Sequence, residues 1–174
     1  MPVALKLVTP PEKEGRPKRQ KEKNQEKDPF QTDAAPVAVT EAPLVVGNNR
    51  KVLVVDDNPV VLKAFELKLK ASGFAVITTS NAATVASTAE EEKVELIILD
   101  INFTAGGGME WNGFTITQWL RRFPELAKIP IIYITGADTA KYKDKVAAAG
   151  GVAFFQKPVN YRELLNAVMQ ALSR

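Results

Sequence analysis

The chain contains neither cysteine nor histidine among its 174 residues. The absence of cysteine excludes a disulfide framework and a thiolate metal site. The absence of histidine excludes a histidine-based catalytic triad, a histidine-ligated zinc ion and a phosphohistidine on this chain. Any phosphohistidine chemistry must therefore come from a partner.

Long apolar runs and a strong excess of one charge are also missing. No run approaches the ~18 apolar residues of a membrane-spanning helix, and the N-terminus lacks the apolar core and cleavage site of a signal peptide. The chain has 23 basic and 20 acidic residues, a net charge of +3, without the motif of a DNA-binding module. We therefore expect a cytoplasmic protein with no direct contact to nucleic acid or to a membrane.

Composition divides the chain into two parts. Residues 1–49 contain seven of the 11 prolines and show no periodic apolar spacing, which predicts a disordered N-terminal tail. The basic residues between positions 13 and 23 leave a docking segment as an alternative, although glutamates are interspersed among them. Residues 50–174 have the apolar patterning of a single folded domain.

Short apolar runs alternate with helical patterns throughout this second part. The expected strands are 51–55, 74–79, 94–99, 130–134 and 152–156. The expected helices are 59–72, 81–93, 114–123, 138–149 and 160–172. Such alternation is typical of parallel strands joined by right-handed helical crossovers. It predicts an α/β fold, a doubly wound five-stranded parallel sheet in the flavodoxin-like order 2-1-3-4-5.

Polar residues follow four of the five expected strands. Asp56 and Asp57 follow the first strand, Asp100 the third, Thr135 the fourth and Lys157 the fifth. Taken singly, each residue also fits a simpler role, such as a helix cap, a turn residue or a solvated charge. In an open α/β sheet, however, the carboxyl ends of the strands form one ligand-binding edge. Carboxylates supply the hard oxygen ligands of Mg²⁺, and a carboxylate is also a nucleophile toward phosphorus.

Four short motifs at these positions resemble those of a known family. They are Val-Val-Asp-Asp-Asn at 54–58, Leu-Ile-Ile-Leu-Asp ending at Asp100, Tyr-Ile-Thr-Gly ending at Gly136, and the pair Lys157-Pro158. Over residues 51–174 the chain resembles the receiver domain of bacterial two-component response regulators. We therefore expect residues 50–174 to form a receiver domain.

The resemblance implies a phosphorylation site. Asp100 corresponds to the phosphoacceptor, and Thr135 and Lys157 to the residues that contact the phosphoryl group. Phe154, three residues before Lys157, corresponds to the aromatic residue that the family uses as a switch.

The resemblance also implies a Mg²⁺ site. Asp57 and Asp100 correspond to metal ligands, together with the backbone carbonyl of Asn102. Asp56 corresponds to an acid that acts through a metal-bound water.

The implied function is a signalling switch rather than an enzyme. A histidine kinase or a histidine phosphotransfer protein would donate the phosphoryl group to Asp100. A downstream protein, or a second copy of the chain, would bind through the fourth helix, the fifth strand and the fifth helix. Because the sequence ends soon after the last helix, we expect a stand-alone receiver.

One stretch departs from the family pattern. Between Asp100 and Gly113 the chain is longer than that pattern, lacks the usual proline and contains Gly106–Gly108, which affects the expected rates of phosphorylation.

Two other functions remain as alternatives. A degenerate receiver that binds partners without phosphorylation is one alternative. The other is an aspartyl-phosphate phosphatase, because Asp100, Asn102 and Thr104 partly resemble the loop of haloacid-dehalogenase-type enzymes. There, Asn102 could not act as a general acid.

Overall fold

The computed structural model describes residues 46–103, 112–137 and 139–173. Most of the expected tail, residues 1–45, and the glycine-rich stretch Gly106–Gly108 lie outside this part of the chain. The elements are β1 (Lys51–Val55), α1 (Pro59–Ala71), β2 (Ala75–Thr79), η1 (Ala82–Thr84), α2 (Val85–Glu91), β3 (Leu96–Asp100), α3 (Gly113–Leu120), β4 (Ile131–Thr135), η2 (Thr139–Lys141), α4 (Lys143–Ala148), β5 (Ala153–Gln156) and α5 (Tyr161–Leu172).

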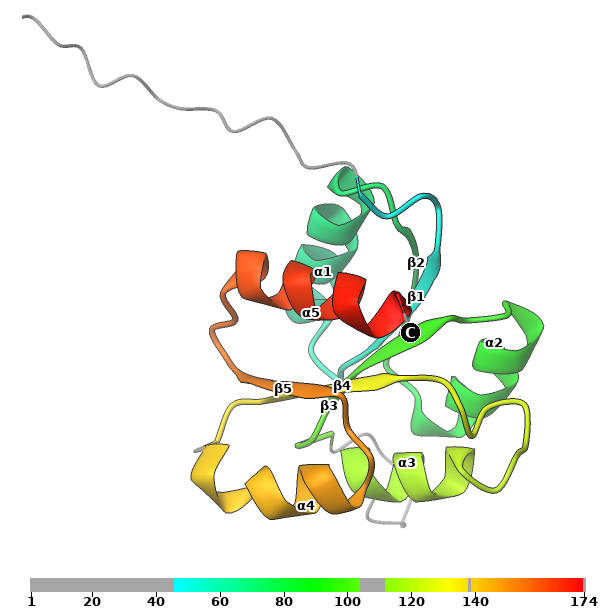
Figure 1. The fold of residues 1–174 in the computed structure, drawn as a ribbon, viewed down its shortest axis with the longest axis vertical. Coiled ribbons are helices and arrows are strands. Elements are labelled where there is room, and N and C mark those ends of the chain that lie inside the picture. The colour runs from blue at the N-terminus through cyan, green and yellow to red at the C-terminus, as the bar shows by residue number, and fades with distance from the viewer. Residues whose placement is uncertain (1–45, 104–111, 138, 174) are drawn as a thin grey trace, which may run out of the picture. The chain divides into compact units, whose positions relative to one another are not determined.

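The five strands form one parallel sheet in the order β2-β1-β3-β4-β5 (Figure 1), which confirms the predicted fold class. Val55 at the end of β1 pairs with Leu99 of β3, and Asp100 pairs with Ile134 of β4. The carboxyl ends of β1, β3 and β4 therefore lie side by side. This register places the residues that follow the three strands at one edge of the sheet.

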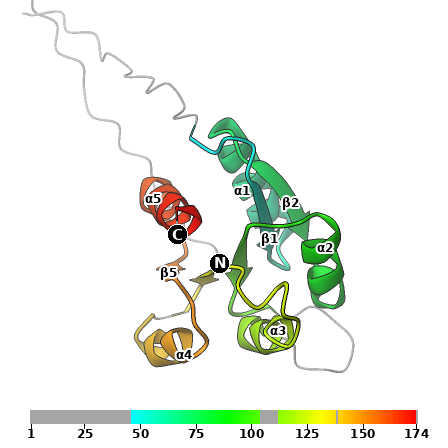
Figure 2. The ribbon, with the colours of Figure 1, turned by 45° about the vertical axis from the view of Figure 1, so that its right-hand side comes forward.

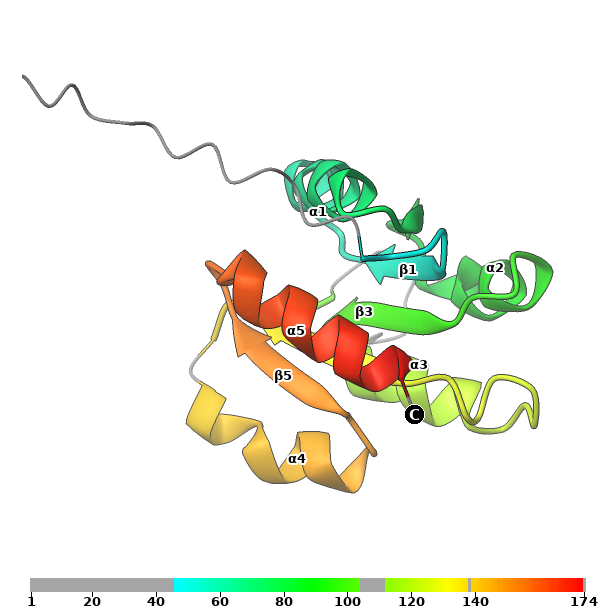
Figure 3. The same ribbon diagram turned by 45° about the horizontal axis from the view of Figure 1, so that its top comes forward.

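Helices cover both faces of the sheet (Figure 1). α1 and α5 pack on one face, and α2, α3 and α4 on the other. Because successive side chains of a strand point to opposite faces, Val52 and Val54 of β1 enter the first core while Leu53 and Val55 enter the second. Figures 2 and 3 show the edge strand β5 between α5 and α4.

Two α-helices are only about half as long as the sequence pattern indicated. The segment expected at 81–93 begins with the 3₁₀ turn η1, and only Val85–Glu91 is α-helical. The segment expected at 138–149 contains the turn η2 and a six-residue α4 with one buried residue, Val146. Short helices depend on tertiary burial, which is small in α4. In the described residues, no helix is long and apolar enough to span a membrane.

The described chain begins before β1 with a segment that contacts the turn between α1 and β2. Val46 N–H and Gly47 N–H donate to the Ser72 carbonyl at 3.0 and 2.8 Å, and Asn49 N–H donates to the Gly73 carbonyl at 2.8 Å. Val46 also packs against the core beneath α1 and α5. Residues 46–49, which composition assigns to the tail, thus contact the domain.

A side chain at Gly47 has no room in this segment. A Cβ atom there would lie 2.5 Å from both the Gly73 carbonyl carbon and the Phe74 nitrogen, which are backbone atoms. We expect Gly47→Ala to displace the segment and lower the free energy of unfolding by about 1–3 kcal/mol, measured by urea denaturation. Gly136→Ala is the control, because a Cβ there meets nothing within 4 Å. Equal losses in both variants would contradict this account.

Candidate functional site

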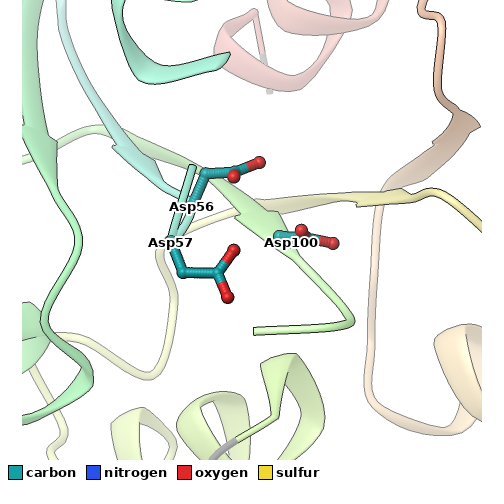
Figure 4. A group of neighbouring side chains, drawn as sticks. All are labelled: Asp56, Asp57 and Asp100. Atoms are coloured by element: carbon teal, nitrogen blue, oxygen red, sulfur yellow. The ribbon is translucent and has the colours of Figure 1, made fainter. Parts of the chain in front are cut away.

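Three carboxylates gather beyond the ends of β1 and β3 (Figure 4). Asp56, Asp57 and Asp100 each offer an oxygen that lies within 4.8 Å of the other two. Asp56 is 2% exposed and Asp100 is 5% exposed, while Asp57 is more accessible. Because two of these three like charges are removed from water, they require a compensating cation.

Each of the two buried carboxylates is held by a local backbone turn, and the two turns are of the same type. Asn58 N–H donates to Asp56 Oδ1 at 2.9 Å, and Asn102 N–H donates to Asp100 Oδ1 at 3.0 Å. An aspartate that accepts from the backbone two residues ahead forms an Asx turn, which fixes its side-chain direction. Each carboxylate is thereby left with its Oδ2 atom for a partner elsewhere in the fold.

Lys157 supplies that partner to both carboxylates. Its Nζ donates to Asp56 Oδ2 at 2.6 Å and to Asp100 Oδ2 at 2.8 Å. The lysine follows β5, whose neighbour in the sheet is β4, and its backbone N–H donates to the Thr135 carbonyl at 2.7 Å. The side chain therefore reaches past the end of β4 to the acids. Its peptide bond to Pro158 is cis.

Burial and pairing act in opposite directions on these charges. Burial raises the pKa of Asp56 above its usual 3.8, although hydrogen bonds from Lys157 and Asn58 oppose the shift. Burial alone would lower the pKa of Lys157, but its bonds to Asp100 and Asp56 outweigh this, and the pKa stays above the usual 10.5. Lys157 is consequently a cation throughout the neutral range.

Thr135 is the last residue of β4 and is fully buried. Its Oγ1 accepts from Asn102 Nδ2 at 3.1 Å and from Ala137 N–H at 3.0 Å. Tyr142 Oη in turn donates to Asn102 Oδ1 at 3.2 Å. The sequence pattern singled out Thr135 and the Asn102 carbonyl but neither the Asn102 carboxamide nor Tyr142. A tyrosine 40 positions away carries no local signal of this contact.

Phe154 lies in β5, two strands away from β3 in the sheet. It pairs with Tyr133 of β4 and is half-buried against the core beneath α3 and α4. The structure thus brings the three acids, Lys157 and Thr135 to one edge of the sheet, whereas Phe154 packs against the core beneath α3 and α4.

The donor set fits a divalent cation. Three carboxylates and one ammonium group carry formal charges of −3 and +1, which sum to −2, when all are ionised. A single Mg²⁺ balances that charge, and carboxylate oxygens are among its preferred ligands. The more exposed Asp57 lies on the solvent side, where an ion can enter.

Comparison with known proteins agrees with the fold. The chain matches the response regulator receiver domain over residues 52–169 and belongs to this family. The family consists of signalling proteins of two-component systems rather than classical enzymes. The fold and the site therefore define a receiver domain.

Individual relatives cover the same part of the chain. The polar-differentiation response regulator DivK of Brucella anthropi is 28% identical over 123 residues, which are 71% of this chain and 96% of that protein. A response regulator from Desulfuromonas acetoxidans has a similar structure, with a TM-score of 0.63 and 28% identity over 71% of this chain and 97% of the other. The chemotaxis protein CheY4 of Vibrio cholerae shares the fold at 24% identity, with a TM-score of 0.62 over 71% of this chain and 98% of the other.

Removal of the Lys157 ammonium group should show how much the buried carboxylates destabilise the fold when they lack a cation. We expect Lys157→Met to lower the free energy of unfolding by about 1–3 kcal/mol at pH 7 in EDTA, because two buried carboxylates lose their cation. Chemical denaturation measures this loss.

The sign of the pH dependence follows from the shifted pKa values. Because the pKa of Lys157 is raised on folding, its stabilisation is complete at neutral pH and is lost only as the pH rises past 10.5. In Lys157→Met the deficit should shrink as the pH falls through the raised pKa of Asp56, because the protonated acid needs no cation, and it should also shrink on addition of Mg²⁺. Lys63→Met is the control, since the Lys63 side chain is 63% exposed on α1. A loss of unfolding free energy that depends on neither pH nor Mg²⁺ would argue against an origin in the buried carboxylates.

Proposed function

We propose that the chain is a phosphorylation-controlled signalling switch with Asp100 as the phosphoacceptor. A histidine kinase or histidine phosphotransfer protein in the cytoplasm supplies the phosphoryl group, and the reaction requires Mg²⁺. The observation that carries the proposal is the contact of Lys157 with both Asp56 and Asp100 beside Asp57. The degenerate receiver finds no support in this site, because its acids, lysine and threonine are all in place.

The chemistry follows from the arrangement of charges. A carboxylate oxygen of Asp100 forms a bond to phosphorus while the P–N bond to the donor's histidine breaks and its electron pair stays on the imidazole. The Asx turn and Lys157 hold the Asp100 carboxylate in one orientation before the reaction. Lys157 also stabilises the negative charge of the transferring group, since a fixed ammonium needs no reorganisation.

Mg²⁺ would be held by Asp57 and Asp100 with the Asn102 carbonyl, and by Asp56 through a water molecule. When bound, it neutralises charge on the phosphoryl oxygens. Without it, a phosphoryl dianion would approach three carboxylates that share a single ammonium group. Rapid phosphorylation should therefore depend on the ion.

Phosphorylation of Asp100 changes the surface formed by α4, β5 and α5, which a partner recognises. Phosphorylation draws the Thr135 hydroxyl toward the new dianion, and space opens that the ring of Phe154 can enter. Phe154 is a residue of β5. This strand lies between α5 and α4 (Figures 2 and 3). A downstream protein or a second copy of the chain binds this surface. Lys141, Lys143 and Lys145 are exposed in η2 and α4 and favour an acidic partner.

Substitution of the acceptor tests the proposal directly. Incubation with acetyl phosphate and Mg²⁺ should add one phosphoryl group to the protein, detected by intact-mass spectrometry. Asp100→Asn should not be labelled, because an amide oxygen is a poor nucleophile. Asp144→Asn, an exposed aspartate of α4, should be labelled like the unaltered protein. Equal labelling of Asp100→Asn would disprove the assignment.

The metal ligands are tested by calorimetric titration. Asp57→Ala removes one hard ligand, so we expect the Kd for Mg²⁺ to rise more than about tenfold, or ~1.4 kcal/mol. The fold should persist, because loss of one like charge offsets the lost contacts. Asp144→Ala should leave the Kd unchanged. An unchanged Kd in Asp57→Ala would refute the ligand role.

A further inference from the structure

We propose that Tyr142 is a positioning residue for Thr135. Through the carboxamide of Asn102, it holds the Thr135 hydroxyl in its unphosphorylated position and ties that position to α4. The inference rests on the proposed phosphorylation of Asp100 but concerns a different set of contacts from those that bind the phosphoryl group and the metal.

The contacts form a chain from α4 to β4. Tyr142 Oη donates to Asn102 Oδ1 at 3.2 Å, and Asn102 Nδ2 donates to Thr135 Oγ1 at 3.1 Å. Asn102 lies two residues after Asp100, to which its backbone N–H is already bonded at 3.0 Å. The residue that orients the acceptor carboxylate therefore also bridges Thr135 and Tyr142.

The geometry of an amide makes the two side-chain bonds interdependent. The carboxamide of Asn102 is planar, so a hydrogen bond to its oxygen sets the direction of its Nδ2. If the Thr135 hydroxyl moves toward a phosphoryl group on Asp100, Nδ2 loses its acceptor unless the whole carboxamide follows. To follow, it must leave Tyr142. The tyrosine hydroxyl consequently opposes the movement of Thr135.

Tyr142 is itself fixed by packing and by the backbone of α4. Its ring lies 6.0 Å from that of Phe114 of α3, which lies 5.3 Å from that of Tyr133 of β4. Its carbonyl accepts from Val146 N–H at 2.8 Å, at the start of α4. Because Val146 is the one buried residue of this helix, release of Tyr142 loosens an element with little other anchoring.

The test uses Tyr142→Phe, which removes the hydroxyl and keeps the ring. The probe is beryllofluoride with Mg²⁺, a stable mimic of the phosphoryl group, titrated by calorimetry. We expect about three- to fivefold tighter binding in Tyr142→Phe, the effect of one modest hydrogen bond that no longer opposes the bound state. In an Asn102→Ala background, the same substitution should change binding by less than about 1.5-fold.

A matched control keeps the interpretation specific. Tyr161→Phe removes another tyrosine hydroxyl, which donates to the Lys68 carbonyl at 2.6 Å and bonds Ser72 Oγ at 2.9 Å at the junction of α1 and α5. It should leave beryllofluoride binding unchanged. Unchanged binding in Tyr142→Phe, or an equal gain in the Asn102→Ala background, would overturn the proposal.

A second readout is independent of phosphorylation. In the free protein, Tyr142→Phe should shift the NMR signal of the Thr135 methyl group, and Tyr161→Phe should not. Failure of the unaltered protein to bind beryllofluoride would overturn the proposed function, whereas the methyl shift would still establish the contact. Binding by the unaltered protein with no methyl shift in Tyr142→Phe would overturn only the role of Tyr142.

Discussion

The site depends on one ammonium group placed between two buried carboxylates. Asp56 and Asp100 come from β1 and β3, and removal of their charges from water is costly unless a cation accompanies them. Lys157 meets this requirement from the end of β5, two strands away from β3 in the sheet. The sheet order, the register of β3 on β4 and the path after β5 must all be right for this contact to form. The geometry of the candidate site therefore depends on the fold through this one electrostatic contact.

The same constraint leaves the site ready for chemistry. One lysine cannot neutralise three acids, and the excess negative charge favours the binding of a divalent cation. Asp56 and Asp100 are preoriented by short backbone turns at the strand ends, so the proposed phosphorylation would need little rearrangement. A rigid reacting centre beside a lightly anchored α4 is a physically sensible arrangement for a switch, because the response is concentrated in the element that costs least to move.

The chain of contacts through Asn102 extends this reasoning to the surface. Thr135 lies at the strand edge, Tyr142 at the start of α4, and the carboxamide between them links the two without reaching the α4–β5–α5 surface through Phe154. The proposed switch would therefore have two routes from Asp100 to α4, one through aromatic packing and one through hydrogen bonds. Their separate weights are an experimental question that conservative substitutions can answer.

Local sequence patterns determined a large part of this protein. Apolar runs such as Leu96–Leu99 predict buried strands, because the pattern of apolar and polar residues along a strand or helix is a short-range property of the sequence. Right-handed crossovers then put helices on both faces, and the flavodoxin-like strand order places Asp57, Asp100 and Thr135 at one edge. Composition likewise separates a tail from a domain, although it places the boundary after residues 46–49, which contact the turn between α1 and β2.

Tertiary structure alone decided which side chains meet. No sequence spacing predicts that Lys157 bonds the Oδ2 atoms of both Asp56 and Asp100, or that Tyr142 reaches Asn102, because these partners lie 40 to 101 residues apart. Such contacts depend on side-chain rotamers, on the exact path of loops and on the burial that a folded sheet creates. The sequence determined the chemical groups at the edge of the sheet, and the fold decided their hydrogen-bond partners, because partner choice is a property of three-dimensional packing.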